Sequence, residues 1–276
     1  MTKKLSNFSL TEGFNINTVA KTIWLNNAFK DNLVMQEIDD PFKGYDENIS
    51  EYIDASWNHL KDRAKSNFPP NTPFVFYNSN TLSWRGLSEN NKVLVSKGIT
   101  YKDIASIRSN SILFKKLKNK TKPNAFVVVS LLITSDNKIV LGRRKYYGDW
   151  LYNTFETAGA FLKIEDLADK SLVNNAKNKV CEDFNNISEL KTIPFIIYHL
   201  PRILETVLVC ISKTNQQALS LTSDLYSEIL IRENSKKGLE YLIKIPLNEF
   251  HPPSRVVIQA YYQNFTLAKQ LLEKLG

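Results

Sequence analysis

Cysteine, histidine and long apolar runs are scarce in this chain of 276 residues. The two cysteines, Cys181 and Cys210, are too few for a disulfide scaffold or a cysteine-based zinc site, and both lie in apolar stretches. The three histidines stand singly, without a partner at metal-ligand spacing. The longest apolar run, Ala125 to Ile133, falls well short of the ~20 residues that span a bilayer. These absences exclude a disulfide-rich scaffold, a cysteine-based zinc module and a membrane-spanning helix, and buried free thiols in a reducing compartment are expected.

The N-terminus lacks the features of a targeting segment. It has two lysines but no apolar core, and Glu12 is unfavourable for a transit peptide. We therefore expect a cytoplasmic protein, with the nucleus also open, and no membrane partner.

The net charge of +8 suits a polyanionic partner, but the positions of the lysines weaken that interpretation. The one dense run lies between Lys115 and Lys122, directly before an apolar strand. A solvated linker explains this run best, with a phosphate or nucleic-acid contact as the minor alternative. Since no nucleic-acid-binding module accompanies the run, we do not expect a nucleic-acid partner.

The first half of the chain predicts an extension followed by a small α+β region. Residues 1–48 are rich in Asn, Asp and Lys and predict a partly ordered extension. Residues 49–122 predict an N-terminal α+β region that opens with an amphipathic helix over 49–65. Short strands are predicted at 74–77, 81–84 and 92–96. A helix is predicted from Tyr101 to Ile107, because Thr100 and Asp103 match a capping box.

Residues 123–276 predict a larger α/β domain. The run from Ala125 to Ile133 is typical of a fully buried strand, and a turn then leads to a hairpin partner at 139–141. Apolar residues spaced by four predict a helix from Ser171 to Phe184. Further strands are predicted at 194–200, 203–211 and 239–245, and a last helix from Pro253 or Ser254 to Leu275.

The order of elements from Ala125 to Ile187 resembles the core of the Nudix hydrolase superfamily. A hairpin is followed by an arginine pair, Trp150, a turn at Gly159 and a helix that ends in two acids. The superfamily motif, Arg-Glu-apolar-any-Glu-Glu-any-Gly, maps onto Asn178 to Asn185. Only the closing acid pair and the apolar position agree, and no Glu stands at the motif's first acidic position. The resemblance implies a Nudix-type α/β/α sandwich with a mixed sheet.

Further segments are similar to one branch, the UDP-glucose and UDP-galactose hydrolases with a degenerate motif. These segments run from Val93 to Asn110 and from Lys179 to Asn185, and include Gly142-Arg143-Arg144 and the closing PPSRVVIQAYYQ. The resemblance implies a nucleoside diphosphate derivative as ligand, and Mg²⁺ or Mn²⁺ as cofactor if the protein is active.

Glu182 and Asp183 are the predicted metal ligands that the resemblance implies. Carboxylates three and four positions apart share a helix face, so residues 179, 182 and 183 would point at one spot and could hold a Mg²⁺ ion. The first of them is Lys179, whose ammonium would oppose a cation there. Three alternatives stay open: a solvated helix end with an ordinary ion pair, ligation by both acids, and an inactive site with a built-in counter-ion.

Arg143 and Arg144 are predicted substrate contacts, because guanidinium groups bind diphosphates through paired hydrogen bonds. Either arginine could instead face solvent. Tyr146, Tyr147 and Trp150 could stack on a base, with Trp150 the strongest candidate, although covering the core is the simpler role.

Two functions therefore remain. One is metal-assisted hydrolysis of a nucleoside diphosphate derivative, such as a UDP-sugar, by attack of water on phosphorus. The other is a catalytically inactive Nudix-fold protein that binds a nucleotide or a macromolecule, including a protein partner. A third acid, Glu156, Glu165 or Glu205, within ~5 Å of Glu182 and Asp183 would favour a stable metal site.

Overall fold

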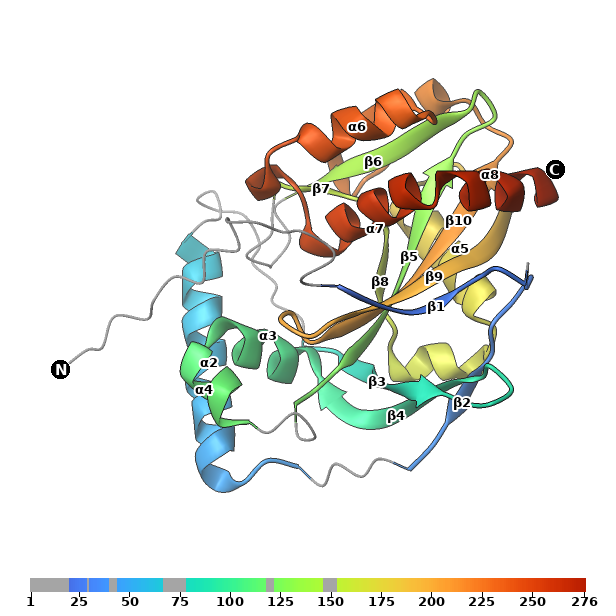
Figure 1. The fold of residues 1–276 in the computed structure, drawn as a ribbon. Coiled ribbons are helices and arrows are strands. Elements are labelled where there is room, and N and C mark those ends of the chain that lie inside the picture. Colours follow the sequence, from blue (N-terminus) through green and yellow to red (C-terminus); the bar gives the residue numbers. More distant parts are fainter. Residues whose placement is uncertain (1–19, 29, 40–43, 67–77, 118–121, 146–152) are drawn as a thin grey trace.

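The computed structural model describes residues 20–28, 30–39, 44–66, 78–117, 122–145 and 153–276. These residues form one mixed sheet with helices on both faces, shown in Figure 1. The strands are β1 (Lys21–Leu25), β2 (Met35–Glu37), β3 (Asn80–Leu87), β4 (Val93–Thr100), β5 (Ala125–Ile133), β6 (Lys138–Arg144), β7 (Phe155–Glu156), β8 (Ala158–Phe161), β9 (Leu190–Leu200), β10 (Glu205–Thr214) and β11 (Tyr226–Glu233). The helices are α2 (Glu47–Ser66), α3 (Tyr101–Ser109), α4 (Ser111–Lys116), α5 (Leu172–Asp183), α6 (Lys236–Lys244), α7 (Pro252–Gln263) and α8 (Phe265–Lys274), with short 3₁₀ turns η1 (Ile164–Ala168), η2 (Ala218–Ser220) and η3 (Leu247–Glu249).

The sheet follows the order β1-β9-β10-β5-β3-β4-β2, and β6, β7, β8 and β11 branch from it. β10 runs parallel to β5 and β2 runs parallel to β4, while the other strand pairs are antiparallel. This arrangement confirms the predicted α/β class with a mixed sheet. β1 pairs with β9, so part of the predicted extension belongs to the sheet. The boundaries at 48 and 122 stay a prediction.

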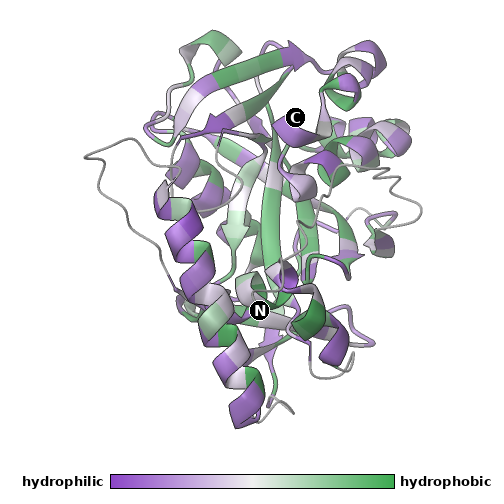
Figure 2. Cartoon of the chain, turned by 90° about the vertical axis from the view of Figure 1, so that its left-hand side faces the viewer, coloured by the Kyte–Doolittle hydropathy of each residue, from purple (hydrophilic) through white to green (hydrophobic). Residues whose placement is uncertain are grey.

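β5 is buried along its whole length, as its apolar run predicts. Side chains of a strand alternate between the two faces, so each face of β5 packs against a different layer. Val127, Val129 and Leu131 share a core with α7 and α8, while Phe126 and Val128 pack with α5. Figure 2 shows the central strands largely in the hydrophobic colour, whereas α2 carries both colours. The strand is apolar throughout because helices cover both of its sides.

The predicted helices of the N-terminal half are also confirmed. α2 buries Ile53, Trp57 and Leu60 at helical spacing. α3 begins with the predicted capping box: the Asp103 N–H donates to Thr100 Oγ1 at 3.3 Å, and the Thr100 N–H donates to Asp103 Oδ2 at 2.7 Å. Residues 74–77 lie outside the described residues.

The prediction of a strand over 239–245 is wrong, because these residues belong to helix α6. Ser235 caps the helix by accepting the Gly238 N–H at 3.1 Å. Leu239 and Leu242 are both buried, and their spacing of three is that of a helix face. β6 also pairs with β11, a strand that sequence reasoning missed.

The predicted last helix is two helices. α7 ends at Gln263 and α8 begins at Phe265, with a break at Asn264. The Asn264 side chain donates to the Ala260 carbonyl at 3.0 Å, which supports a helix end there. Across the described ranges, every helix is too short or too polar to cross a membrane.

Candidate functional site

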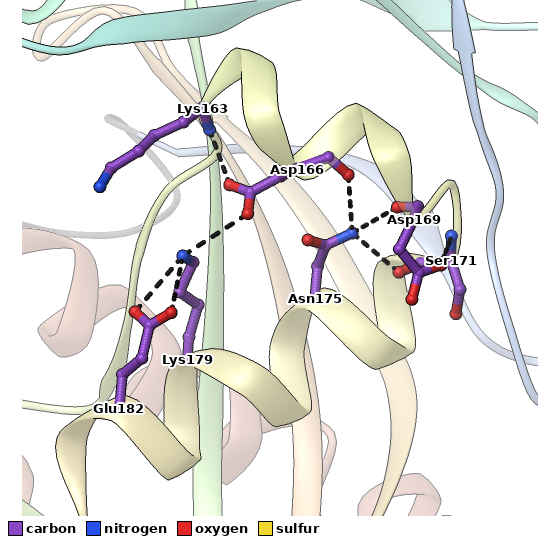
Figure 3. A network of polar contacts seen from close by, with 7 residues as sticks. All are labelled: Lys163, Asp166, Asp169, Ser171, Asn175, Lys179 and Glu182. Carbon is purple, nitrogen blue, oxygen red and sulfur yellow. Dashed lines mark hydrogen bonds and ion pairs between the residues drawn. The ribbon is translucent and has the colours of Figure 1, made fainter.

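The helix that carries the predicted metal ligands is anchored at its first turn. Ser171 caps α5 by accepting the Asn174 N–H at 3.1 Å. The side-chain amide of Asn175 donates to the carbonyls of Asp169 at 2.8 Å and Ser171 at 2.9 Å, as Figure 3 shows. These contacts fix α5 against the segment that contains η1.

Lys179 lies between two carboxylates. Its side chain is 7% exposed, and its Nζ atom lies 3.3 Å from Glu182 Oε1 and 3.6 Å from Asp166 Oδ1. Figure 3 shows the ammonium between the two acids, with Asp166 also accepting the Lys163 N–H at 2.8 Å. Sequence reasoning missed Asp166, because Lys163 has no side-chain acceptor and the pair gives no capping-box signature. Lys179 and Glu182 therefore form an ion pair within α5.

Asp183 points to a different neighbourhood. Its Oδ2 atom accepts the backbone N–H of Gly159 at 3.0 Å. The pKa of Asp183 is raised to about 7, first by burial and then by the charge of Glu156, against the lowering effects of Gly159, Tyr226 and Arg144. Near neutral pH this carboxyl is therefore protonated in a large fraction of molecules.

Glu156 lies near Asp183 and forms an ion pair with Arg144. Its carboxylate is 7% exposed and binds Arg144 through two nitrogens, Nε at 3.0 Å and Nη2 at 2.9 Å. Tyr226 is buried beside them, and burial together with the charges of Glu156 and Asp183 raises the pKa of its hydroxyl well above the usual value. The guanidinium of Arg144 is therefore bound to a buried carboxylate.

Arg143 faces the other side of β6, because neighbouring residues of a strand alternate. Its Nε atom donates to Glu228 at 2.7 Å and its Nη2 atom lies 3.4 Å from Glu249. Its guanidinium lies 3.9 Å from the centre of the Phe155 ring. Arg143 lines a pocket of about 460 Å³.

The three candidate acids lie in different settings. Glu156 lies close enough for its charge to raise the pKa of Asp183. Glu205 instead forms a buried ion pair with Arg108 at 3.0 Å, and no described contact brings Glu165 to α5. Tyr146, Tyr147 and Trp150 lie outside the described residues.

The donor set does not fit a divalent cation. Within the described ranges, no group of three or more His, Cys, Asp or Glu side chains is arranged to hold a metal. Glu182 is next to an ammonium and Glu156 is bound by a guanidinium. A Mg²⁺ ion needs several hard oxygen ligands that converge on one point. The positive side chains of Lys179 and Arg144, which already bind these acids, oppose such an ion.

Neither a family model nor a curated protein matches the sequence. Among solved structures, a Nudix hydrolase from Nitrosomonas europaea is 16% identical, with 51% of this chain and 72% of that chain covered and a TM-score of 0.37. A protein from Deinococcus radiodurans is 12% identical, with 67% and 99% covered and a TM-score of 0.41. A bifunctional NMN adenylyltransferase/ADP ribose pyrophosphatase from Francisella tularensis, solved with AMP and a manganese ion, is 14% identical at a TM-score of 0.36, with 56% of this chain and 42% of that chain covered. The matches therefore report a low-identity likeness to solved structures that include a Nudix hydrolase, and they single out no branch.

Proposed function

We propose that this chain is a Nudix-like protein that binds a nucleoside diphosphate derivative without metal-assisted hydrolysis. The observation that carries the proposal is the position of Lys179, whose ammonium lies between Asp166 and Glu182. An ammonium at the expected metal position replaces the charge of a cation. It supplies neither an open coordination site nor an activated water.

The second predicted ligand also argues for weak metal binding. A proton on Asp183 competes with any cation, and its pKa of about 7 leaves that proton on a large fraction of the molecules near neutral pH. Glu156, the nearest further acid, is held by Arg144 at two points. A divalent ion would have to displace both a proton and a guanidinium before two carboxylates became available.

The nucleoside diphosphate class comes from the resemblance to the UDP-glucose and UDP-galactose hydrolases. A UDP-sugar is therefore the first ligand to test. Arg143 lines a pocket large enough for a small molecule, since such sites measure about 300–1,000 Å³. A non-catalytic binding protein of this kind could also bind another nucleotide or a macromolecular partner, including a protein.

The second candidate is the hydrolase. It is favoured by the proximity of the Asp183 and Glu156 carboxyl groups, which is the kind of pair that could bind a cation once Arg144 moves. In that reaction the water oxygen attacks phosphorus, the bond to the bridging oxygen breaks, and the proton passes to solvent. The metal would be Mg²⁺ or Mn²⁺.

The test is a panel of nucleoside diphosphate derivatives, UDP-glucose and UDP-galactose among them, with Mg²⁺ or Mn²⁺. Phosphate products and calorimetric binding are measured in parallel. We expect binding without turnover. Turnover that disappears in Asp183→Asn would overturn the proposal in favour of the hydrolase. A wild type that neither binds nor cleaves any member of the panel would reject both functions.

A further inference from the structure

The pocket lined by Arg143 lies between β11 and α6. Strand β11 contributes Glu228, Leu230 and Arg232, whose period of two places them on one face. Helix α6 contributes Tyr241 and Lys244, which are three positions apart and therefore neighbours on the helix surface. The strand and the helix thus form two facing walls.

The cationic side chains that line the pocket differ in their partners. Arg143 is bound by Glu228 and Glu249, so this arginine has two carboxylate partners. Arg232 and Lys244 form no ion pair with any described residue. The Nη1 atom of Arg232 donates to the Ile231 carbonyl at 2.7 Å, which leaves its other nitrogens for a ligand. Among the described residues, these two positive charges therefore have no carboxylate partner.

An aromatic ring lies next to the first of these cations, Arg232. The guanidinium of Arg232 lies 4.1 Å from the centre of the Tyr241 ring, and Tyr241 is 51% exposed. Phe155, Leu230 and Ile245 add apolar surface to the same pocket. A large exposed aromatic beside unpaired cations suits a ligand that carries both an aromatic ring and an anionic group.

Arg255 of α7 holds the C-terminal end of α6 in place. Arg255 donates to the Leu242 carbonyl at 2.6 Å and to the Ile245 carbonyl at 3.0 Å. These carbonyls lie at the C-terminal end of α6, where few backbone N–H groups remain to bind them, although the Leu242 carbonyl also accepts the Ile245 N–H at 3.4 Å. The wall that contains Tyr241 and Lys244 is therefore positioned before any ligand arrives.

We propose that this pocket binds the diphosphate group of an aromatic ligand through Arg232 and Lys244, with Tyr241 packing on the ring. The inference rests on the proposed function for the ligand class and assigns its binding site. That site lies on the face of β6 that Arg143 occupies, opposite the face where Arg144 meets Glu156 and Asp183.

Calorimetry with UDP, inorganic pyrophosphate and uridine tests the assignment. We expect UDP to bind tightest, because it alone combines the ring with both phosphates. Arg232→Gln and Lys244→Gln should each weaken UDP binding about tenfold, as expected for loss of one charge-assisted hydrogen bond. Tyr241→Ala should weaken UDP binding but leave pyrophosphate binding unchanged.

Lys237→Gln is the matched control, because Lys237 is exposed on α6 and does not line the pocket. It removes the same charge and should bind UDP as the wild type does. Circular dichroism of each variant checks that the fold is kept. UDP binding that is unchanged in Arg232→Gln and Lys244→Gln would overturn the pocket assignment alone. A wild type that binds UDP-sugars but neither UDP nor pyrophosphate would also overturn the assignment and leave the proposed function standing.

Discussion

Lys179 and Glu182 are three positions apart on α5, and their charged groups are 3.3 Å from each other. Asp166 completes the arrangement from η1, at 3.6 Å from the same ammonium. One buried lysine therefore lies between two acids at the position where the superfamily motif carries a metal ligand. We expect this relationship to oppose cation binding at α5.

Changing Lys179→Glu should strengthen divalent metal binding. The variant replaces a positive charge with a carboxylate on the same helix face, beside Glu182 and Asp166. Coulomb energies at an effective dielectric near 20, reduced by salt, indicate a gain of ~1–3 kcal/mol for Mn²⁺. Manganese titration of the wild type, Lys179→Glu and Lys179→Gln measures the gain. Lys179→Gln removes the charge without adding a ligand, so its gain should be smaller. Equal affinity in all three proteins would show that these acids form no metal site.

Asp183 should make stability fall as pH rises through neutrality. Its folded-state pKa of about 7 lies above the unfolded value of ~3.9, so the folded protein holds an extra proton between these values. That stabilisation is fully present below the unfolded pKa of ~3.9 and is lost progressively as pH rises to the folded pKa of about 7. The wild type should therefore lose on the order of 2 kcal/mol between pH 5 and pH 8, and Asp183→Asn, which stays neutral, should not show this loss.

Urea unfolding at both pH values tests this prediction. Glu189→Gln is the control, because it removes an exposed carboxylate after the same helix. The control should keep the pH dependence of the wild type. An Asp183→Asn variant with the same pH dependence as the wild type would contradict the raised pKa.

Gly159→Ala should destabilise the protein strongly. Gly159 has φ +152°, and an added Cβ would lie 2.4 Å from the Val128 carbonyl oxygen and 2.6 Å from the Val129 Cα. Backbone atoms of a buried strand cannot move aside easily, so we expect a loss of ~2 kcal/mol or more beyond the strain of the backbone angle. Gly86→Ala isolates that strain, since Gly86 has φ +142° and no atom within 4 Å of its added Cβ. Comparable urea midpoints for the two variants would refute the close approach.

Arg144→Ala should lower stability because it leaves the buried Glu156 carboxylate without its bidentate partner. Breaking a buried pair from one side typically costs ~3–5 kcal/mol, and the partial exposure of Arg144 places this case at the lower end. Adding Glu156→Gln should recover much of the loss, because it removes the buried charge that Arg144 binds. Urea denaturation of the two single variants and the double variant measures the coupling, and purely additive losses would argue against it.

Val128→Ala and Leu131→Ala should each cost ~2–3 kcal/mol through lost burial and a cavity. Both side chains are fully buried in β5, one on each face of the sheet. Leu219→Ala serves as the control, because Leu219 is 90% exposed and its truncation should change the urea midpoint little. A small loss at both β5 positions would contradict the central place of this strand.

The sequence predicts most elements whose signal is local. The apolar run of β5 is continuous in sequence, and the two residues of the Thr100–Asp103 capping box are three positions apart. Short-range chemistry is therefore enough to predict each of them. It fails where a short apolar segment is ambiguous, as in α6, whose residues 239–245 suit either a strand or a helix. It also cannot locate the break at Asn264, where the helical apolar pattern continues on both sides.

The tertiary structure decides which partners the candidate residues meet. The sequence by itself determines that Lys179 and Glu182 share a helix face, because helical geometry fixes that relation. Only the fold brings Asp166 to Lys179 and aims Asp183 at Gly159, since these contacts join separate elements. It likewise places Arg143 and Arg144 on opposite faces of β6, where one meets a pocket and the other a buried carboxylate. Long-range contacts of this kind follow from the packing of the sheet and its helices, because strand pairing and layer order are not encoded in any single segment.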